Sequence, residues 1–379
     1  MRPRLFVAVA VFVAVAGIVC LDQRLVQAGE QPAASGYKVL EPLRHGSLTV
    51  FPVAAPQSYA TAEFLTLDEG LRSGDVVVTE YGNVRGLLRR RHITPAMQHD
   101  SAEVNRLVLI NNSKRPLLLL AGEIVTGGKQ DRVIGKDRIV PPESDPVDLS
   151  VFCVEPGRWV ATSDQFGMSG TTYGSGSGGG IGGGVYRGVM AQPSVRAKAM
   201  GDKDQNQVWA EVRKQQQAME TVEVAASAAP VPTTSYARVM ENKDVKEKVD
   251  EVARPIEQNY QTLIKQLRDR KAVGVVVAVN GRIIWSDVFA STELLEKYWP
   301  KLVRSYASEA VVTRAKGGEA SLSQAEAFLA DMDGHKETIE SEPGIYRHTE
   351  INGDGFKAFA LTSLLPKTGF DVHVAKMAE

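Results

Sequence analysis

The chain has 379 residues, of which 43% are hydrophobic and 23% are charged. This composition is typical of a folded globular protein and excludes disorder as the overall state, while the length suits about two domains. The formal net charge of −1 at pH 7 gives no electrostatic reason to expect a nucleic-acid partner.

Residues 1–28 are predicted to be a signal peptide. Arg2 and Arg4 precede an uncharged run of 17 residues, Leu5 to Leu21, and Ala28 ends a small-residue cleavage site. We therefore expect a periplasmic or secreted protein. The alternative is a leader that stays uncleaved and anchors the chain in the membrane, although 17 residues is short for a bilayer span.

The start of the mature chain is expected to be irregular. Residues 29–36 are small and polar, which is typical of a flexible tether. Cys20 would leave with the leader, so Cys153 would remain alone and could form no disulfide within the mature chain.

Residues 37–165 are predicted to be β-rich. Short apolar runs such as Leu48–Val53 and Arg106–Ile110 are separated by turn residues. Residues 131–134 and 137–140 are expected to form the two arms of a hairpin around Gly135-Lys136. Pairing in this half should be mainly antiparallel.

The segment from residue 166 to residue 188 contains 11 glycines in 23 residues. Such a composition cannot offset the entropy of ordering its backbone by burying side chains. We expect a flexible glycine-rich loop here.

Residues 193–375 are predicted to mix helices and hairpins. A helix is expected over 205–222, and apolar residues recur every three or four positions from Val245 to Leu267, which indicates a longer amphipathic helix. Asn280-Gly281 between two apolar runs is typical of a type I′ hairpin turn. Ser291 and Ser321 are expected to cap two further helices.

The end of the chain is expected to add strands. A second hairpin is predicted from 345–351 and 356–361, and a last strand from 371–375. The fold class is therefore α+β, with a mainly antiparallel β-rich N-terminal half and a helix-hairpin-helix C-terminal half.

No catalytic signature accompanies this pattern. The six histidines form no zinc-binding spacing, so we expect no metal, and no serine-hydrolase elbow of the type G-x-S-x-G occurs. No cofactor is expected either. Cys153 lies within an apolar strand, where a thiol usually behaves as a small buried hydrophobic group.

One segment concentrates polar residues beside glycines and forms the candidate ligand-binding site. Charged side chains in two strand-like segments would be fixed by apolar neighbours, and the glycines permit a turn whose amides face an anion. The alternative is a tight structural corner in which the charges pair with one another. The candidate residues are Glu123, Gly127, Gly128, Lys129, Gln130, Arg132, Glu155, Arg158 and Trp159.

The runs LLLLAGEIVTGGKQDRV, VFCVEPGRW, QNQVWAEV and VVVAVNGRIIWSDVFASTELLEKYWPKLVRSYASEA resemble the bacterial ARG-and-rhodanese-phosphatase-superfamily-associated protein domain, a domain of unknown function. The similarity extends from roughly Leu48 to Val374. It implies a single family domain over residues 37–375, named for its association with ADP-ribosylglycohydrolase-like and rhodanese-phosphatase-like proteins. It carries over no catalytic residues.

Two classes of function follow. The first is an exported, non-catalytic module that binds an anionic small molecule or an envelope protein. The second is a hydrolase acting on a phosphorylated or ADP-ribosylated substrate, with Glu123 or Glu155 as general base and Lys129, Arg132 or Arg158 stabilising the anionic group.

Overall fold

The computed structural model describes residues 36–80, 106–157, 163, 165–167, 188–223, 233–267, 270–313 and 318–379. The predicted signal peptide, nearly all of the predicted tether, most of the predicted glycine-rich loop, and the candidate residues Arg158 and Trp159 lie outside these residues. The described residues belong to one compact unit, Gly36–Glu379.

The larger of the β structures is an antiparallel sheet of nine strands, counted over the described residues. At one edge, β2 (Leu43–His45) also pairs with the second strand of the main path. In spatial order the main path runs β1 (Lys38–Val39), β3 (Leu48–Ala55), β13 (Lys271–Val279), β14 (Arg282–Phe289), β18 (Asp371–Ala378), β17 (Phe356–Ser363), β16 (Tyr346–Gly353) and β15 (His335–Glu342).

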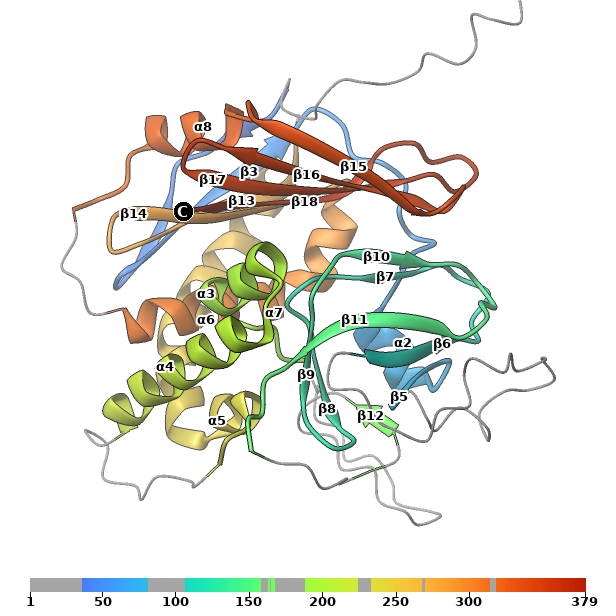
Figure 1. The fold of residues 1–379 in the computed structure, drawn as a ribbon. Coiled ribbons are helices and arrows are strands. Elements are labelled where there is room, and N and C mark those ends of the chain that lie inside the picture. Colours follow the sequence, from blue (N-terminus) through green and yellow to red (C-terminus); the bar gives the residue numbers. More distant parts are fainter. Residues whose placement is uncertain are drawn as a thin grey trace, which may run out of the picture. The chain divides into compact units, whose positions relative to one another are not determined.

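This sheet joins the two ends of the chain. The register of β3 against β13 places Val53 opposite Gly274 and Val50 opposite Val277. Figure 1 shows the blue N-terminal strands beside the orange and red C-terminal ones. The N-terminal strands are therefore part of a structure that is otherwise built from the C-terminal half.

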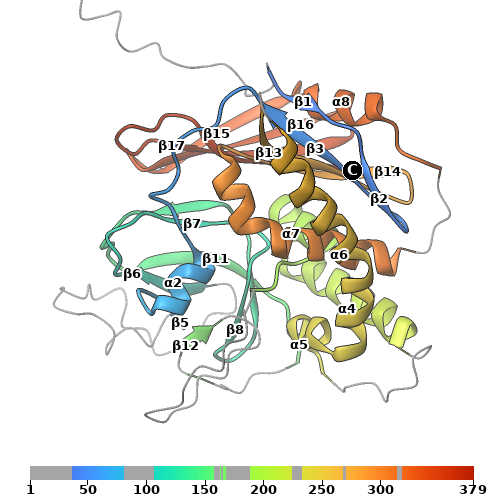
Figure 2. The same ribbon diagram turned by 180° about the vertical axis from the view of Figure 1, so that it is seen from behind.

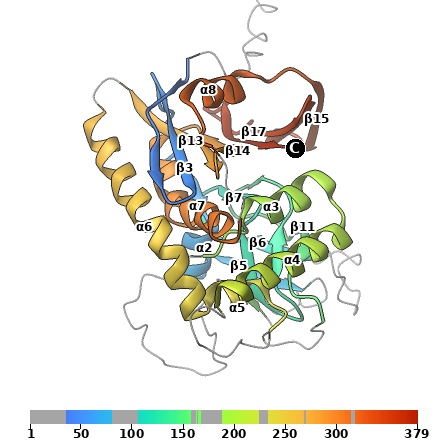
Figure 3. The same cartoon turned by 90° about the vertical axis from the view of Figure 1, so that its left-hand side faces the viewer.

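Helices cover both faces of the sheet. Residues alternate along β13, so Val275 and Val277 pack with α6 (Lys243–Gln266) and α7 (Thr292–Val312), whereas Val276 and Ala278 pack with α8 (Leu322–Ala330). Figure 3 shows α6 and α7 on one side of the sheet and α8 on the other. Both faces of β13 are consequently buried.

The second β structure is a closed barrel. Its interior contains apolar side chains such as Val78, Leu109 and Val125. The strands, in order around the barrel, are β11 (Val147–Cys153), β6 (Arg106–Asn111), β5 (Val76–Glu80), β12 (Gln165–Gly167), β8 (Ile124–Gly127) and β9 (Arg132–Ile134).

A short sheet and a helix lie beside the barrel. β7 (Leu117–Leu119) pairs with β10 (Arg138–Val140) and with β4 (Leu65–Thr66). Helix α2 (Leu67–Ser73) follows β4 directly and packs its Leu67 and Leu71 with the barrel core. In Figure 2, β7 and α2 lie on the barrel side of the molecule.

Four helical elements pack on the outer face of the barrel strands. Ile124 and Val133, which alternate with inward-facing residues, contact Val195 and Val208 of these helices. The elements are α3 (Pro193–Ala197), the π-helix η4 (Lys198–Asp202), α4 (Gln205–Glu223) and α5 (Tyr236–Glu241).

Several local predictions are confirmed. Asn280 and Gly281 both adopt positive φ, 51° and 77°, and join β13 to β14. Ser291 accepts a hydrogen bond from Leu294 N, and Ser321 forms a capping box with Gln324. The fold class is α+β with mainly antiparallel pairing, apart from the parallel pair of β4 and β7, and the N-terminal half is β-rich.

The predicted hairpin around Gly135-Lys136 is wrong. β9 pairs with β8 and β11, whereas β10 pairs with β7. Residues 135–137 therefore cross from the barrel to the short sheet. Local turn residues suggested a hairpin, but the apolar partners of both strands lie elsewhere in the chain.

Candidate functional site

Glu123 stands immediately before β8 and is buried, with 2% of its surface exposed. Its carboxylate accepts a hydrogen bond from Leu120 N at 2.7 Å and forms an ion pair with Lys301 of α7. Lys301 also contacts Asp68 of α2, at 3.2 Å from Nζ to Oδ2. Although burial alone would lower it, the pKa of the Lys301 ammonium is raised by these two carboxylates.

The glycine turn at the other end of β8 has its amides occupied by the protein itself. Gly127 and Gly128 adopt φ of 127° and 49°. Gly127 N donates to Asp131 Oδ1 at 3.0 Å, and Lys129 N donates to Glu80 Oε1 at 2.9 Å. The amides of this turn do bind carboxylates, as its geometry predicts, but these carboxylates are side chains of the same protein, Asp131 and Glu80.

Gln130, Arg132 and Glu155 lie together behind this turn. Glu155 Oε2 accepts from Asp131 N at 3.0 Å, and Gln130 Nε2 donates to the Glu155 carbonyl at 3.1 Å. Arg132 is fully buried and donates from Nη1 to the Gln130 carbonyl at 2.7 Å. Ser235, which caps α5, donates to Asp131 Oδ2 at 2.5 Å.

The structure thus divides the predicted site. Gly127 to Arg132 and Glu155 form one cluster, which holds the β8–β9 turn against β11 and α5. Glu123 lies at the opposite end of the four-residue strand β8, about 13 Å away along the chain. Arg158 and Trp159 lie outside the described residues.

A second buried network was not predicted from the sequence. His373 of β18 lies between Asp137 and Asp287, with Nδ1 at 2.6 Å from Asp137 Oδ2 and Nε2 at 3.1 Å from Asp287 Oδ1. Arg196 of α3 donates two hydrogen bonds of 2.9 Å to the Asp287 carboxylate. Tyr306 of α7 also donates to Asp287. We call these five residues the His373 network.

The charge states of the His373 network support each other. Burial alone would lower the pKa of His373, but Asp137 and Asp287 raise it to about 9. Burial opposes ionisation of Asp287, yet Arg196 and His373 hold the pKa of that carboxyl far below its usual range. At neutral pH the network therefore contains an imidazolium between two carboxylates, each stabilised by further donors.

The turn from Leu120 to Glu123 connects the two groups of buried charges. Leu120 N donates to Glu123, and Ala121 N donates to Asp137 Oδ1 at 2.7 Å. Gly122 between them has φ of 97°, and a Cβ at this position would lie 2.6 Å from Arg196 Cγ. This turn places β8, α3 and α7 relative to one another.

One sequence signal pointed to the His373 network. Asp287 and His373 each lie between apolar residues of a strand that is largely buried, and a charged side chain is rarely buried unless it is paired. The identity of the partners was not readable from spacing, because Arg196, Asp287 and His373 are separated by 86 or more positions.

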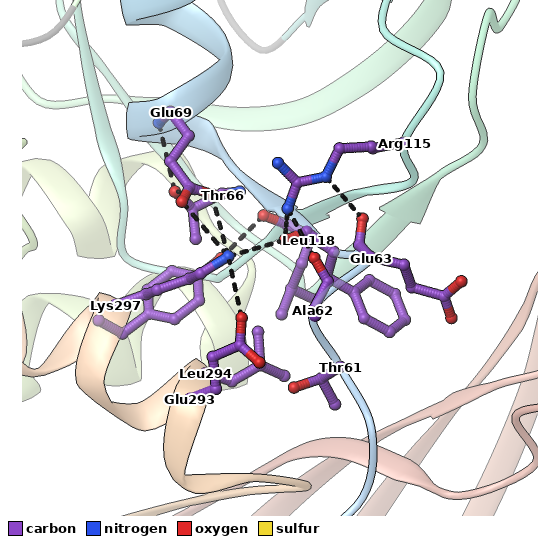
Figure 4. A network of polar contacts seen from close by, with 12 residues as sticks. Thr61, Ala62, Glu63, Thr66, Glu69, Arg115, Leu118, Glu293, Leu294 and Lys297 are labelled. Carbon is purple, nitrogen blue, oxygen red and sulfur yellow. Dashed lines mark hydrogen bonds and ion pairs between the residues drawn. The ribbon is translucent and has the colours of Figure 1, made fainter.

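A surface groove lies between α2 and the turn from β6 to β7. It has a volume of about 680 Å³ and is lined by charged and polar residues that include Glu69, Arg72, Asp75, Asn112, Lys114 and Arg115. Figure 4 shows how its wall is fixed: Arg115 donates to the carbonyls of Ala62, Glu63 and Phe64, and Lys297 bridges Phe64 and Glu69.

The described ranges contain neither a cluster of metal-binding side chains nor a helix suited to a membrane. No group of three or more His, Cys, Asp or Glu side chains there is arranged to hold a metal ion. None of the helices there has both the length and the apolar character needed to span a bilayer.

The comparisons identify the domain. The family model of the ARG and Rhodanese-Phosphatase-superfamily-associated Protein domain matches residues 36–376. No curated protein and no solved structure matches the chain. The matched range includes all the helices described above and every strand except the last two residues of β18.

Proposed function

The chain belongs to the ARG and Rhodanese-Phosphatase-superfamily-associated Protein domain family, and we propose that it is an exported, non-catalytic module that binds an anionic small molecule. Membership assigns the domain and no chemistry, so the proposal rests on the side chains. The observation that carries it is the burial and internal pairing of the carboxylates that a hydrolase would need.

Glu123 and Glu155 are the two carboxylates considered as general bases. Glu123 is 2% exposed and Glu155 is 3% exposed. The first forms an ion pair with Lys301, and the second accepts the Asp131 amide. A general base must reach the proton of a bound substrate or water, so these contacts favour a structural role for both carboxylates.

The groove beside α2 is the best-supported place for an anion. Arg72 and Lys114 contribute cations to it, and Arg115 donates to backbone carbonyls in its wall. Of its two carboxylates, Glu69 is engaged by Lys297 and by the α2 capping box, and Asp75 accepts a hydrogen bond from Ser73. The turn that carries Lys114 is rigid, because the Asn111 side chain donates to the Arg115 and Pro141 carbonyls at 2.9 and 3.0 Å. A preformed turn reduces the entropy lost on binding.

Binding from a library of phosphorylated, ADP-ribosylated and glycan compounds tests the proposal. We expect the double variant Arg72→Ala/Lys114→Ala to lose tenfold or more in affinity, about 1.4 kcal/mol or more, with little change in melting temperature. Lys248→Ala on α6, which removes an exposed surface ion pair with Glu251, is the matched control and should bind normally.

Two results would contradict the proposal. Turnover of a library compound that is abolished by Glu123→Gln or Glu155→Gln would establish a hydrolase. Capture of an envelope protein through the same groove, without small-molecule binding, would replace the small ligand with a protein partner.

Export is proposed separately from the leader sequence. We expect the mature chain to begin near Gly29 and to be soluble outside the cytoplasm. N-terminal sequencing of the protein from each cell fraction tests this, and an intact Met1 chain in the membrane fraction would make the leader an anchor.

A further inference from the structure

A second cavity, of about 300 Å³, lies where the end of α6, the start of β13 and the start of α7 meet. Its apolar part includes Ile264 and Leu267, which are partly buried and pack against the main core. Its polar part includes two cations, Arg270 and Lys271, and none of the described residues that line it is a carboxylate. The cavity therefore combines apolar surface with a net positive charge.

The two cations at this cavity have no carboxylate partner within the described ranges. Arg270 makes one hydrogen bond there, from Nη1 to the Gly36 carbonyl at 3.5 Å, which is a long and weak contact. Lys271 is exposed, and its side chain forms neither a hydrogen bond nor an ion pair with a described residue. Most N–H groups of both side chains are thus left for solvent or for a ligand.

Two hydroxyl side chains complete the polar part of the lining. Thr292 Oγ1 donates to the Ala272 carbonyl at 2.7 Å, so its proton is used within the protein. Ser58 Oγ accepts a hydrogen bond from Thr292 N at 3.3 Å, and no described residue accepts the proton of the Ser58 hydroxyl. The loop that carries Ser58 is fixed, because Tyr59 N donates to the Ala290 carbonyl at 2.9 Å. Ser58 can therefore donate a hydrogen bond to a ligand beside the two cations.

This lining favours one class of ligand over others. A neutral hydrocarbon would leave the ammonium and guanidinium groups unused, and a small inorganic anion would leave the apolar surface of Ile264 and Leu267 in water. An anion that carries a hydrocarbon chain satisfies both parts at once. A carboxylate head also matches the planar guanidinium of Arg270, which can donate two parallel hydrogen bonds to it. The volume suits a small ligand.

We propose that this cavity binds an amphiphilic carboxylate, with its head against Arg270, Lys271 and Ser58 and its hydrocarbon chain against Ile264 and Leu267. The site is separate from the groove beside α2, which is lined by different residues that include two carboxylates. It does not depend on the function proposed for that groove.

The test titrates the full-length protein with octanoate by isothermal titration calorimetry. We expect saturable binding of one octanoate per chain. Octanamide, which has the chain without the charge, and acetate, which has the charge without the chain, should each bind about tenfold or more weakly. Equal binding of octanamide and octanoate, or no binding of octanoate, would overturn the proposal.

A charge variant and a matched control link binding to the cavity. Arg270→Gln/Lys271→Gln removes both cations and should lower the affinity for octanoate about tenfold or more. Lys265 is exposed at the same end of α6 but does not line the cavity, so Lys265→Gln should bind normally. Equal losses in the two variants would show that general surface charge attracts the ligand, which would also overturn the proposal.

A filling variant tests the same site without changing its charge. Ser58 is exposed, so Ser58→Leu should leave the melting temperature nearly unchanged while it occupies part of the cavity and weakens octanoate binding. Unchanged affinity in this variant would contradict the proposed position of the ligand. Arg72→Ala/Lys114→Ala should bind octanoate normally, and a loss there would place the ligand in the groove beside α2 instead.

A vesicle experiment separates a free carboxylate from a membrane lipid. Sedimentation with phosphatidylglycerol vesicles should leave the protein in the supernatant, because the proposed ligand enters a cavity as a free molecule. Sedimentation that is lost in Arg270→Gln/Lys271→Gln, without octanoate binding, would make this region a membrane-facing surface and would overturn the proposal.

Discussion

Arg132 and Lys129 are three positions apart but differ in burial. Arg132 is 0% exposed and donates to backbone carbonyls, whereas Lys129 is only partly buried. Arg132→Ala removes a buried donor and leaves a cavity, so we expect it to cost about 3 kcal/mol of unfolding free energy. Lys129→Ala should change the free energy of unfolding by no more than about 0.5 kcal/mol. Urea denaturation of both variants measures the difference.

Equal, small losses for the two variants would contradict a structural role for Arg132. If Arg132→Ala also lost binding of a library compound while remaining folded, the turn would be a ligand site. The pair therefore separates a structural corner from a binding site with the same measurement.

His373 makes the stability of the folded protein decrease at alkaline pH. Its pKa is about 9 in the folded protein, against an ordinary value of 6.5. The unfolded chain loses this proton first, so the contribution is fully present below pH 6.5 and is lost as the pH rises through 9. We expect unfolding free energy to fall by on the order of 3 kcal/mol between pH 6.5 and 9.5.

Urea titrations at closely spaced pH values measure this fall. His373→Gln should be less stable at pH 6.5 and should lose most of the alkaline slope. His335→Gln, at an exposed position on β15, is the control and should keep the wild-type slope. A slope that persists in His373→Gln would assign the titration to another group.

At the scale of elements, the turn before β8 depends on one glycine. Gly122 has φ of 97°, and an added Cβ would meet Arg196, which the Asp287 carboxylate holds in place. Gly122→Ala should therefore lower the free energy of unfolding by more than the backbone strain alone would, which is about 1 kcal/mol. We expect a loss of about 2 to 4 kcal/mol, measured by thermal or urea unfolding.

Gly46→Ala measures the effect of backbone strain without a steric contact. Gly46 also has positive φ, 57°, but nothing lies within 4 Å of the added Cβ. If the two variants lose the same stability, the contact with Arg196 has no energetic importance, and the turn does not fix α3.

Elements whose signals are local were predictable from the sequence. The Asn280-Gly281 turn and the Ser291 and Ser321 caps depend on residues within a few positions of each other. The crossing at residues 135–137 was not predictable from its turn residues, because β9 pairs with β8 and β11, and β10 pairs with β7, instead of pairing with each other. Strand β15 was not predictable, because it lies at a sheet edge and its sequence is mainly polar and charged, without apolar alternation.

The candidate site shows the same division between local and distant information. The carboxylate-filled turn at Gly127 and Gly128 follows from glycines and acceptors in one segment, apart from Glu80. The His373 network instead requires the whole fold, since it draws residues from α3, β14 and β18. At the scale of the molecule, buried charges link the barrel, the helices and the nine-stranded sheet.

That linkage predicts that residues 36–379 unfold as one unit. β3 is buried along its full length and lies between β1 and β13, so a fragment of residues 188–379 lacks the strand that pairs with β13. It would expose β13 as a long apolar edge, which favours aggregation. We expect this fragment to be insoluble or unfolded, whereas residues 36–379 should be soluble and show a single unfolding transition by fluorescence and circular dichroism. A folded, soluble 188–379 fragment, or two separate transitions in the longer chain, would show that the C-terminal half is an autonomous domain and that the N-terminal strands merely add to its edge.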